Sequence, residues 1–210
     1  MLRSLVGSEM CIRDRFIAML KRNYSTIIIG ALALVLLFVP EAKAMMQQGL
    51  MKLGLFEPKL EKVEPTTQPK SKANYTFEMV YADGKAINME DLKGKVVFMN
   101  FWATWCPPCI AEMPSIQKLY DKVKDDNEIV ILTVEVEGKR DKVAKFMERK
   151  NLSLPVVYPN SSIPTEFFNG SLPTTVILDK KGNIAHTTMG MADYSGQDIV
   201  DFLNELKAMD

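Results

Sequence analysis

Two near-continuous apolar runs dominate the pattern of hydrophobic and polar positions in the C-terminal part of the chain. KVVFMNFWA (95–103) and EIVILTVEV (128–136) lack the strict alternation of a half-exposed strand, so we expect strands that are covered on both faces. Between them a helix should run from about 107 to 124, because its leading prolines fit a first helical turn. A second helix is predicted over 138–151, and its apolar face comprises Val143, Phe146 and Met147.

Shorter elements are predicted on both sides of this central pattern. YTFEMVYADGKAINMEDLKG (75–94) has the pattern of an initial hairpin with Asp83-Gly84 as its turn. TTVILD (174–179) predicts a third buried strand, which turns at 181–183 into a fourth, GNIAHTTM. A final helix follows, with Ser195 and Asp198 as a capping pair. The apolar face of that helix comprises Ile199, Phe202, Leu203 and Leu206.

The order of these elements predicts the fold class. Strands that alternate with helices indicate an α/β fold, and the last hairpin makes the sheet mixed. We therefore expect one compact domain over residues 74–210, a central mixed β-sheet flanked by helices. Residues 57–73 carry three prolines and many charges and have almost nothing to bury, so they predict a semi-extended linker.

An apolar run near the N-terminus, at 27–39, predicts a targeting segment. Its 13 residues are short for a spanning helix, which needs roughly 20, and are typical of a signal-peptide core. Residues 42–44 supply an A-x-A cleavage pattern. A retained membrane anchor stays open as well, because low polarity extends back to Tyr24. In either case Lys21 and Arg22, ahead of the run, place the rest of the chain outside the cytoplasm, on the periplasmic side of the cell envelope.

The segments on either side of this run complete the domain plan. MLRSLVGSEMCIRDR (1–15) resembles a translated sequencing-adapter fragment, so residues 1–18 are either non-native, with Met19 as the true start, or a cytoplasmic leader. Residues 19–44 are the signal peptide or membrane anchor, and 45–73 hold an amphipathic segment and the linker. In the amphipathic segment three apolar residues share one helical face, which suits a helix on the membrane surface or one packed on the domain. These residues are Met46, Leu50 and Leu53.

Charge and composition narrow the classes of function. Twenty-six basic and 26 acidic residues cancel, so there is no basic face for nucleic acid. Three cysteines are too few for a disulfide scaffold. One histidine and two close cysteines are also a poor set of ligands for a four-coordinate zinc site. We expect no metal and no dissociable cofactor.

The stretch FWATWCPPCIAEMP (101–114) contains the candidate chemistry. Cys106 falls at the predicted N-terminus of a helix, where free N–H groups and the helix dipole stabilise a thiolate. Cys109 lies three residues on, near enough to close a disulfide ring. Cys106, at the exposed end, is expected to attack a substrate, and Cys109 to resolve the mixed disulfide. Half of a zinc site and a structural disulfide are the alternatives, but the domain has no second cysteine pair, and so short a loop constrains the unfolded chain little.

The same stretch resembles the active-site segment of TlpA/ResA-type thiol-disulfide oxidoreductases, redoxin-type (AhpC/TSA) members of the thioredoxin superfamily. The likeness covers 74–210 and includes SLPTT (171–175). The resemblance implies a thioredoxin-like fold, a redox-active pair of Cys106 and Cys109, and protein disulfides as substrates, with cytochrome c maturation proteins as one client class. It also implies that Pro173 is cis and faces the cysteines, while the backbone of Leu172 pairs with the substrate.

Asn100 and Glu112 are the candidates next to the cysteines. Thioredoxins carry a buried, proton-transferring aspartate six residues before the first cysteine, and this chain has Asn100 there, which cannot titrate. Glu112 lies one turn after Cys109 on the same helical face, and the TlpA/ResA pattern also has a glutamate at this position. A carboxyl in an apolar setting has a raised pKa and could exchange protons with Cys109. The alternative is a solvated glutamate favoured by the helix dipole.

Pro107 and Pro108 bear on the direction of electron flow. Neither has an N–H to offer a thiolate at Cys106, and a less stabilised thiolate makes a less oxidising disulfide. We therefore expect a reductant, kept reduced by a membrane electron donor. Trp105 and these two prolines, together with Leu172 and Pro173, are the predicted substrate-binding residues.

Three other classes share parts of this pattern. Copper assembly factors of the same fold use C-x-x-x-C with a distant histidine, and only His186, which we expect to be a surface residue, could serve here. Thiol peroxidases need P-x-x-x-T-x-x-C, whereas Thr104 lies only two residues before Cys106. A non-enzymatic module that holds clients in the groove is the third. Trp102 is expected in the core, and the loop at 163–171 has no assigned role.

Overall fold

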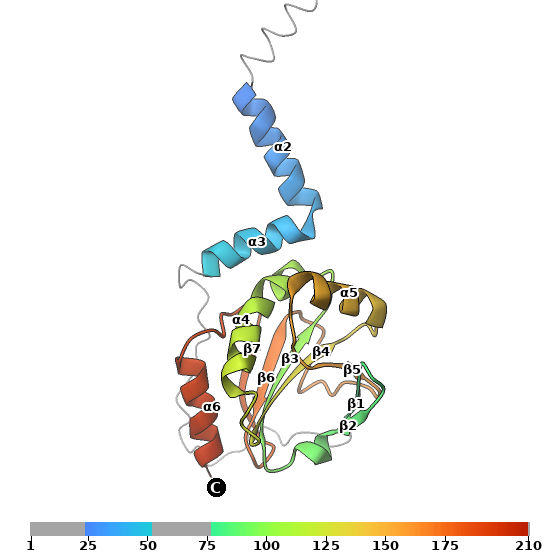
Figure 1. Cartoon of the computed structure of the whole chain (residues 1–210), viewed down its shortest axis with the longest axis vertical. Helices are drawn as coiled ribbons and strands as arrows, with labels where there is room; N and C mark the ends of the chain where they lie inside the picture. The colour runs from blue at the N-terminus through green and yellow to red at the C-terminus, as the bar shows by residue number, and fades with distance from the viewer. Residues whose placement is uncertain (1–23, 52–76, 210) are drawn as a thin grey trace, which may run out of the picture. The chain divides into compact units, whose positions relative to one another are not determined.

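The computed structural model describes residues 24–51 and 77–209, each part by itself (Figure 1). Residues 77–209 form a seven-stranded sheet with the order β2-β1-β5-β4-β3-β6-β7. The pairs β3–β4 and β4–β5 are parallel and the others are antiparallel, so the sheet is mixed, as predicted. The strands are β1 (Glu78–Tyr81), β2 (Ala86–Asn88), β3 (Val96–Trp102), β4 (Ile129–Glu135), β5 (Val156–Pro159), β6 (Thr174–Leu178) and β7 (Ile184–Met189).

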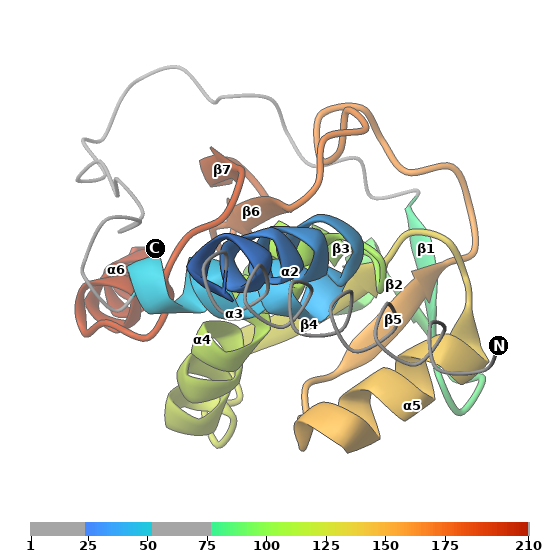
Figure 2. The same cartoon turned by 90° about the horizontal axis from the view of Figure 1, so that it is seen from above.

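Three α-helices cover one face of this sheet. The chain passes from β3 to β4 and then to β5 in the same direction across the sheet, and right-handed crossovers then place both connecting helices on one side. Figure 2 shows α4 and α5 on that side, and α6 packs into the same apolar cluster. The helices of the domain are α4 (Pro107–Val123), α5 (Arg140–Lys150) and α6 (Asp198–Ala208), with a short 3-10 helix η1 (Met89–Leu92).

Strand β3 separates the two layers of the core. All seven of its residues are buried, as expected for a strand that is covered on both faces. Because side chains alternate along a strand, Phe98 and Trp102 pack beneath the helices, while Met99 and Phe101 face the other layer. Asn100 shares its face with Phe98 and Trp102. The strand therefore directs one polar side chain toward α4.

The second face of the sheet is covered by the N-terminal hairpin, η1 and the loop that precedes β6. Phe167 is buried against Phe77, with ring centroids 6.2 Å apart. Phe168 stacks on Phe101 at 5.4 Å with 12° between the ring planes. Two aromatic residues thus fix the 163–171 loop to the sheet.

Two sequence expectations for the domain need correction. Strand β5 was not predicted, since its four residues end in a proline and a second proline precedes them. The capping pair at the last helix is also wrong. Helix α6 has Gln197 as its N-cap residue with no side-chain cap, and the N–H of Ser195 instead bonds Asp193 Oδ1 at 2.9 Å.

The N-terminal described part consists of helices α2 (Tyr24–Phe38) and α3 (Pro40–Met51). Helix α3 covers residues 45–51 of the predicted amphipathic segment and begins five residues earlier, at Pro40. None of the helices in residues 24–51 and 77–209 is both long and apolar enough to cross a membrane. The predictions for residues 1–18 and for the linker at 57–73 lie outside the described residues.

Candidate active site

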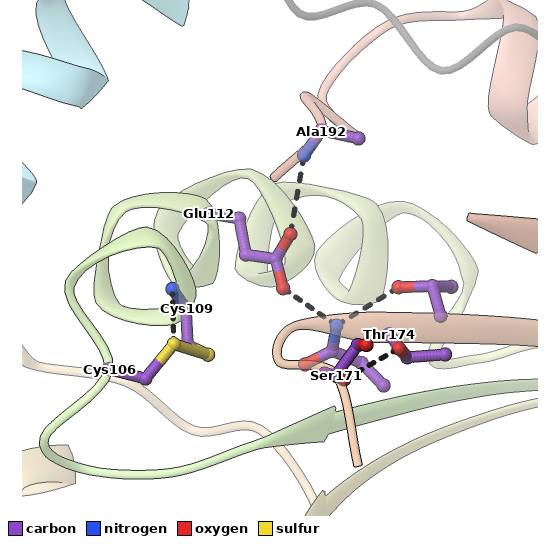
Figure 3. The surroundings of a disulfide bond; sticks show 8 residues. Cys106, Cys109, Glu112, Ser171, Thr174 and Ala192 are labelled. Atoms are coloured by element: carbon purple, nitrogen blue, oxygen red, sulfur yellow. Dashed lines mark hydrogen bonds between the residues drawn. A yellow bond between two sulfur atoms is a disulfide. The ribbon is translucent and has the colours of Figure 1, made fainter. Parts of the chain in front are cut away.

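The two cysteines lie where β3 gives way to α4. Cys106 is the N-cap residue of the helix, and Cys109 is its third residue. Their sulfurs form a disulfide with the Cα atoms 5.3 Å apart. The N–H of Cys109 also donates to Cys106 Sγ at 3.3 Å, which Figure 3 shows. Both cysteines therefore lie at the N-terminus of the helix that the sequence predicted after residue 106.

The exposure of the pair differs from the expectation. Cys106 has an exposed fraction of 3% and Cys109 of 0%, so the order is as predicted but both are buried. Cys106 belongs to the apolar cluster beneath the helices. Pro107 and Pro108 occupy the first two helical positions and offer no N–H, so Cys109 supplies the first backbone donor of the helix.

The Leu172–Pro173 segment reaches the same edge of the sheet. Strand β6 runs antiparallel to β3 with Thr174 opposite Phe101, so the start of β6 lies beside the end of β3. The Leu172–Pro173 peptide bond is cis, as the resemblance implied. Pro173 is buried, and its carbonyl accepts the N–H of Gly190 at 2.8 Å. The topology therefore brings together two motifs that are more than 60 residues apart in the chain.

Glu112 is fully buried one turn beyond Cys109 on α4 (Figure 3). Its Oε1 accepts Asn100 Nδ2 at 2.7 Å, and its Oε2 accepts the N–H of Ala192 at 3.3 Å. Burial raises the pKa of Glu112 to about 8, although both hydrogen bonds work in the opposite direction. Glu112 is therefore a buried carboxyl with a raised pKa, and the solvated alternative is wrong.

Asn100 holds this carboxyl from the sheet. Besides the bond to Glu112, Asn100 Nδ2 donates to Thr175 Oγ1 at 3.0 Å, directly across the strand pair. Asn100 Oδ1 is buried, with no hydrogen-bond partner among the described residues. The residue that replaces the aspartate of thioredoxins cannot carry a proton, but it orients the group that can.

A second set of hydrogen bonds ties α4 to the loop before α6. Ser115 Oγ donates to the carbonyl of Glu112 at 2.7 Å and accepts the N–H of Tyr194 at 3.1 Å. Burial, and then the nearby Glu112, raise the pKa of Tyr194, which keeps its hydroxyl neutral. Sequence reasoning did not find Thr175, Ser115 or Tyr194.

Ser115→Ala should lower the free energy of unfolding by about 1–2 kcal/mol, because it leaves the buried N–H of Tyr194 without an acceptor. Urea unfolding of the oxidised protein measures this change. Ser162→Ala, at an exposed loop position, is the matched control and should change the stability by less than about 0.5 kcal/mol. Equal midpoints for the two variants would contradict the role of Ser115.

The two tryptophans and the histidine of the domain differ in exposure. Trp105 is 57% exposed and directly precedes Cys106 in the chain. Trp102 is fully buried, as predicted, with its ring 5.4 Å from Phe146. His186 is half-buried on β7, where Nε2 lies 2.8 Å from Thr188 Oγ1.

Within the described ranges, no three side chains of the His, Cys, Asp and Glu types gather as a metal site would need. Of the polar groups around Glu112, only the carboxyl itself can exchange a proton, because Asn100 and the N–H of Ala192 are amides.

Comparisons with known proteins agree with this geometry. The Redoxin family profile matches residues 64–199. The chain belongs to the Redoxin family. Family relatives include the thiol-disulfide oxidoreductase ResA of Halalkalibacterium halodurans, 32% identical over 129 residues that span 60% of this chain and 73% of the relative. Another is the thioredoxin-like protein YneN of Bacillus subtilis, 36% identical over 54% of this chain and 68% of the relative.

Solved structures show the same fold. A thioredoxin-family thiol:disulfide interchange protein from Chlorobium tepidum matches with a TM-score of 0.55 and 25% identity, over 68% of this chain and 99% of that one. StoA from Bacillus subtilis matches with a TM-score of 0.51 and 28% identity, over 64% and 98%. Together with the Cys106–Cys109 pair, the family and its relatives identify a thiol-disulfide oxidoreductase with a thioredoxin-like fold, as the motif predicted.

Proposed function

We propose that this Redoxin-family protein reduces protein disulfides outside the cytoplasm, with Cys106 as the attacking sulfur. The observation that carries the direction is the start of α4. Two of its first three residues are prolines, so the backbone offers Cys106 Sγ one N–H, from Cys109. A thiolate with few donors is less stabilised, and the reduced pair then gives up its electrons more readily.

The proposed reaction has two exchange steps. The Cys106 thiolate attacks a client disulfide, a Cys106–client disulfide forms, and the other client sulfur leaves as a thiolate that takes up a proton from water. Cys109 then loses its proton and attacks Cys106 Sγ, which closes the Cys106–Cys109 disulfide and releases the second client thiol. Two electrons pass to the client, and a membrane dithiol donor must return two electrons to the pair.

Glu112 is the proposed acceptor of the Cys109 proton. Burial raises the pKa of Glu112 to about 8, so this carboxyl can take up and release a proton near neutral pH, as the acid–base partner of a thiol must. Asn100 and the N–H of Ala192 hold the carboxyl in place for this transfer. Leu172, Pro173, Trp105 and the two motif prolines are proposed to form the client-binding edge around it.

The proposed location depends on the sequence before the domain. Lys21 and Arg22 precede the apolar helix α2, and such a charge pattern leaves the following chain outside the cytoplasm. We propose that this segment either anchors the protein in the inner membrane or is removed by signal cleavage. Extracytoplasmic compartments are where protein disulfides form and persist, which supplies the substrate class.

The reduction potential of the Cys106–Cys109 pair tests the direction. The full chain is equilibrated against glutathione and dithiothreitol buffers, and the fraction of closed disulfide is measured by thiol alkylation. A potential near or below about −230 mV supports the reductant. A value near about −120 mV would make the protein an oxidant that installs disulfides. Failure to close the disulfide at all would favour a metal-binding role.

A further inference from the structure

Large apolar side chains are rarely exposed on the described domain surface. Within residues 77–209, only three large hydrophobic side chains reach an exposed fraction of 36% or more. They are Trp105 at 57%, Met189 at 64% and Met209 at 36%. Trp105 directly precedes Cys106, and Met209 lies next to the C-terminus. Met189 has no role in the proposed reaction, yet it is the most exposed of the three.

Met189 lies at the edge of the sheet that holds the disulfide. It is the last residue of β7 and pairs with Thr174, the first residue of β6. The next residue, Gly190, bonds the carbonyl of Pro173 at 2.8 Å. Because β6 begins beside the end of β3, Met189 flanks the Pro173 segment on the side away from β3.

The 163–171 loop fixes this methionine. Asn169 Nδ2 donates to Met189 Sδ at 3.6 Å, while Asn169 Oδ1 accepts the N–H of Ser171 at 3.1 Å. The stacking of Phe168 on Phe101 in turn fixes Asn169. One amide therefore holds both the segment that leads into Pro173 and the sulfur of Met189, and the exposed surface of the methionine remains available to a ligand.

We propose that Met189, held by Asn169, is a specificity-determining contact for clients that carry a large apolar residue next to the reacting cysteine. The occupant is an extended segment of a disulfide-bonded protein. A mixed disulfide fixes the client cysteine at Cys106, and extended chain advances about 3.3 Å per residue. Client side chains within a few residues of that cysteine can therefore reach the rim, by which we mean the exposed side chains of Trp105 and Met189. The inference rests on the proposed exchange at Cys106 but not on the direction of electron flow.

The chemistry of the rim favours an apolar client residue over a charged one. The groups that contact Met189 or pair with it, Asn169 and Thr174, carry no charge. A thioether side chain is flexible and polarisable, so it adapts to apolar side chains of different shape. Trp105, which directly precedes Cys106 and lies three residues after the end of β3, provides a second exposed apolar side chain.

The test uses the full chain in mild detergent with Cys11→Ser and Cys109→Ser, so that Cys106 is the reacting thiol. The probes are two peptides, Gly-Gly-X-Cys-X-Gly-Gly with X as leucine or serine, each activated as the mixed disulfide with thionitrobenzoate. Cys106 attacks the peptide sulfur, the Cys106–peptide disulfide forms, and coloured thionitrobenzoate leaves. Rates are divided by those of the same peptides with free glutathione, which removes differences in intrinsic reactivity.

We expect the leucine peptide to react about tenfold faster, and Met189→Gln to reduce that preference to about twofold. Asn169→Ala should give an intermediate preference. Met209→Gln is the matched control and should keep the full preference. Met209 lies two residues after Lys207, which forms an ion pair with Asp126. Asp126 precedes the start of β4, so this methionine is at the edge of the sheet opposite to the disulfide. An equal rate for both peptides, or an unchanged preference in Met189→Gln, overturns the inference. An oxidising potential overturns only the reductase direction, since this preference is measured in a single exchange step.

Discussion

Replacing Cys106 by serine should abolish disulfide reduction, with a loss of at least about 10³-fold in turnover. Cys106 is the N-cap residue of α4 and the outer partner of the disulfide, whereas Cys109 is fully buried in the third helical position. A serine hydroxyl at 106 is not ionised near neutral pH and forms no disulfide with a client. Turnover of a model protein disulfide, with dithiothreitol as the final reductant, measures the loss.

Cys109→Ser is the informative companion to this variant. It keeps the attacking thiol but cannot resolve the mixed disulfide, so clients should accumulate as covalent adducts on Cys106 that dithiothreitol releases. Cys11→Ser serves as the control and should leave turnover unchanged, because the chemistry is assigned to the CPPC pair. Residual turnover in Cys106→Ser that disappears when Cys109 is also replaced would reverse the assigned roles.

Much of the fold could be predicted from the sequence because its central elements are strongly patterned. The run at 95–103 is apolar in every position except its first residue and Asn100, and it becomes β3 with both faces covered. Strand β5 could not be predicted in the same way. It has only four residues, with Pro155 before its first residue and Pro159 as its last. Its pairing with β1 and β4 holds it in place, and a local sequence pattern does not reveal such pairing.

At the last helix, by contrast, a local sequence pattern predicts a cap that the structure does not form. Ser195 and Asp198 have the spacing of a capping pair, but Asp193 Oδ1 takes the N–H of Ser195 in a local turn before the helix begins. Helix α6 is stabilised by its buried apolar face instead. The helix therefore forms without the predicted side-chain cap.

Some residues of the candidate site could be predicted from local sequence, and others could not because they come from distant elements. Cys106, Cys109 and Glu112 belong to one continuous motif, so their spacing on a helix could be deduced. The groups around Glu112 come from β3, β6 and the loop before α6, and Thr175 is 75 residues from Asn100. The usable signal was Asn100 itself, since a polar residue on the same face as Phe98 and Trp102 requires a buried partner.

Glu112→Gln should change the pH dependence of stability in a defined direction. The folded pKa of Glu112, about 8, lies above its ordinary value of 4.5, so the folded protein binds the proton more tightly than the unfolded chain does. Stability is then fully present below about pH 4.5 and is lost as the pH rises toward 8. The loss is about 1.4 kcal/mol per pH unit and roughly 4–5 kcal/mol in total. Glutamine removes this dependence.

The measurement is the free energy of unfolding of the oxidised protein and of Glu112→Gln between pH 4 and 8. The free energy of unfolding of the variant should increase steadily relative to that of the wild type across this pH range. Any destabilisation by the amide itself is independent of pH. Glu135, whose pKa burial also raises, is present in both proteins and cancels in the difference, and Tyr194 stays neutral throughout.

The same variant should slow turnover by about 10²-fold. In the wild type, turnover should rise with pH near 8 as Glu112 loses its proton, and this rise should be absent in the variant, because the base that accepts the Cys109 proton is gone. A stability difference that rises with pH together with unchanged turnover would make Glu112 a structural carboxyl only, and a difference that does not change with pH would contradict its raised pKa. A rising stability difference with slowed turnover and an altered pH profile of turnover would assign the proton transfer to Glu112, because the pH profile reports the group that acts in the reaction.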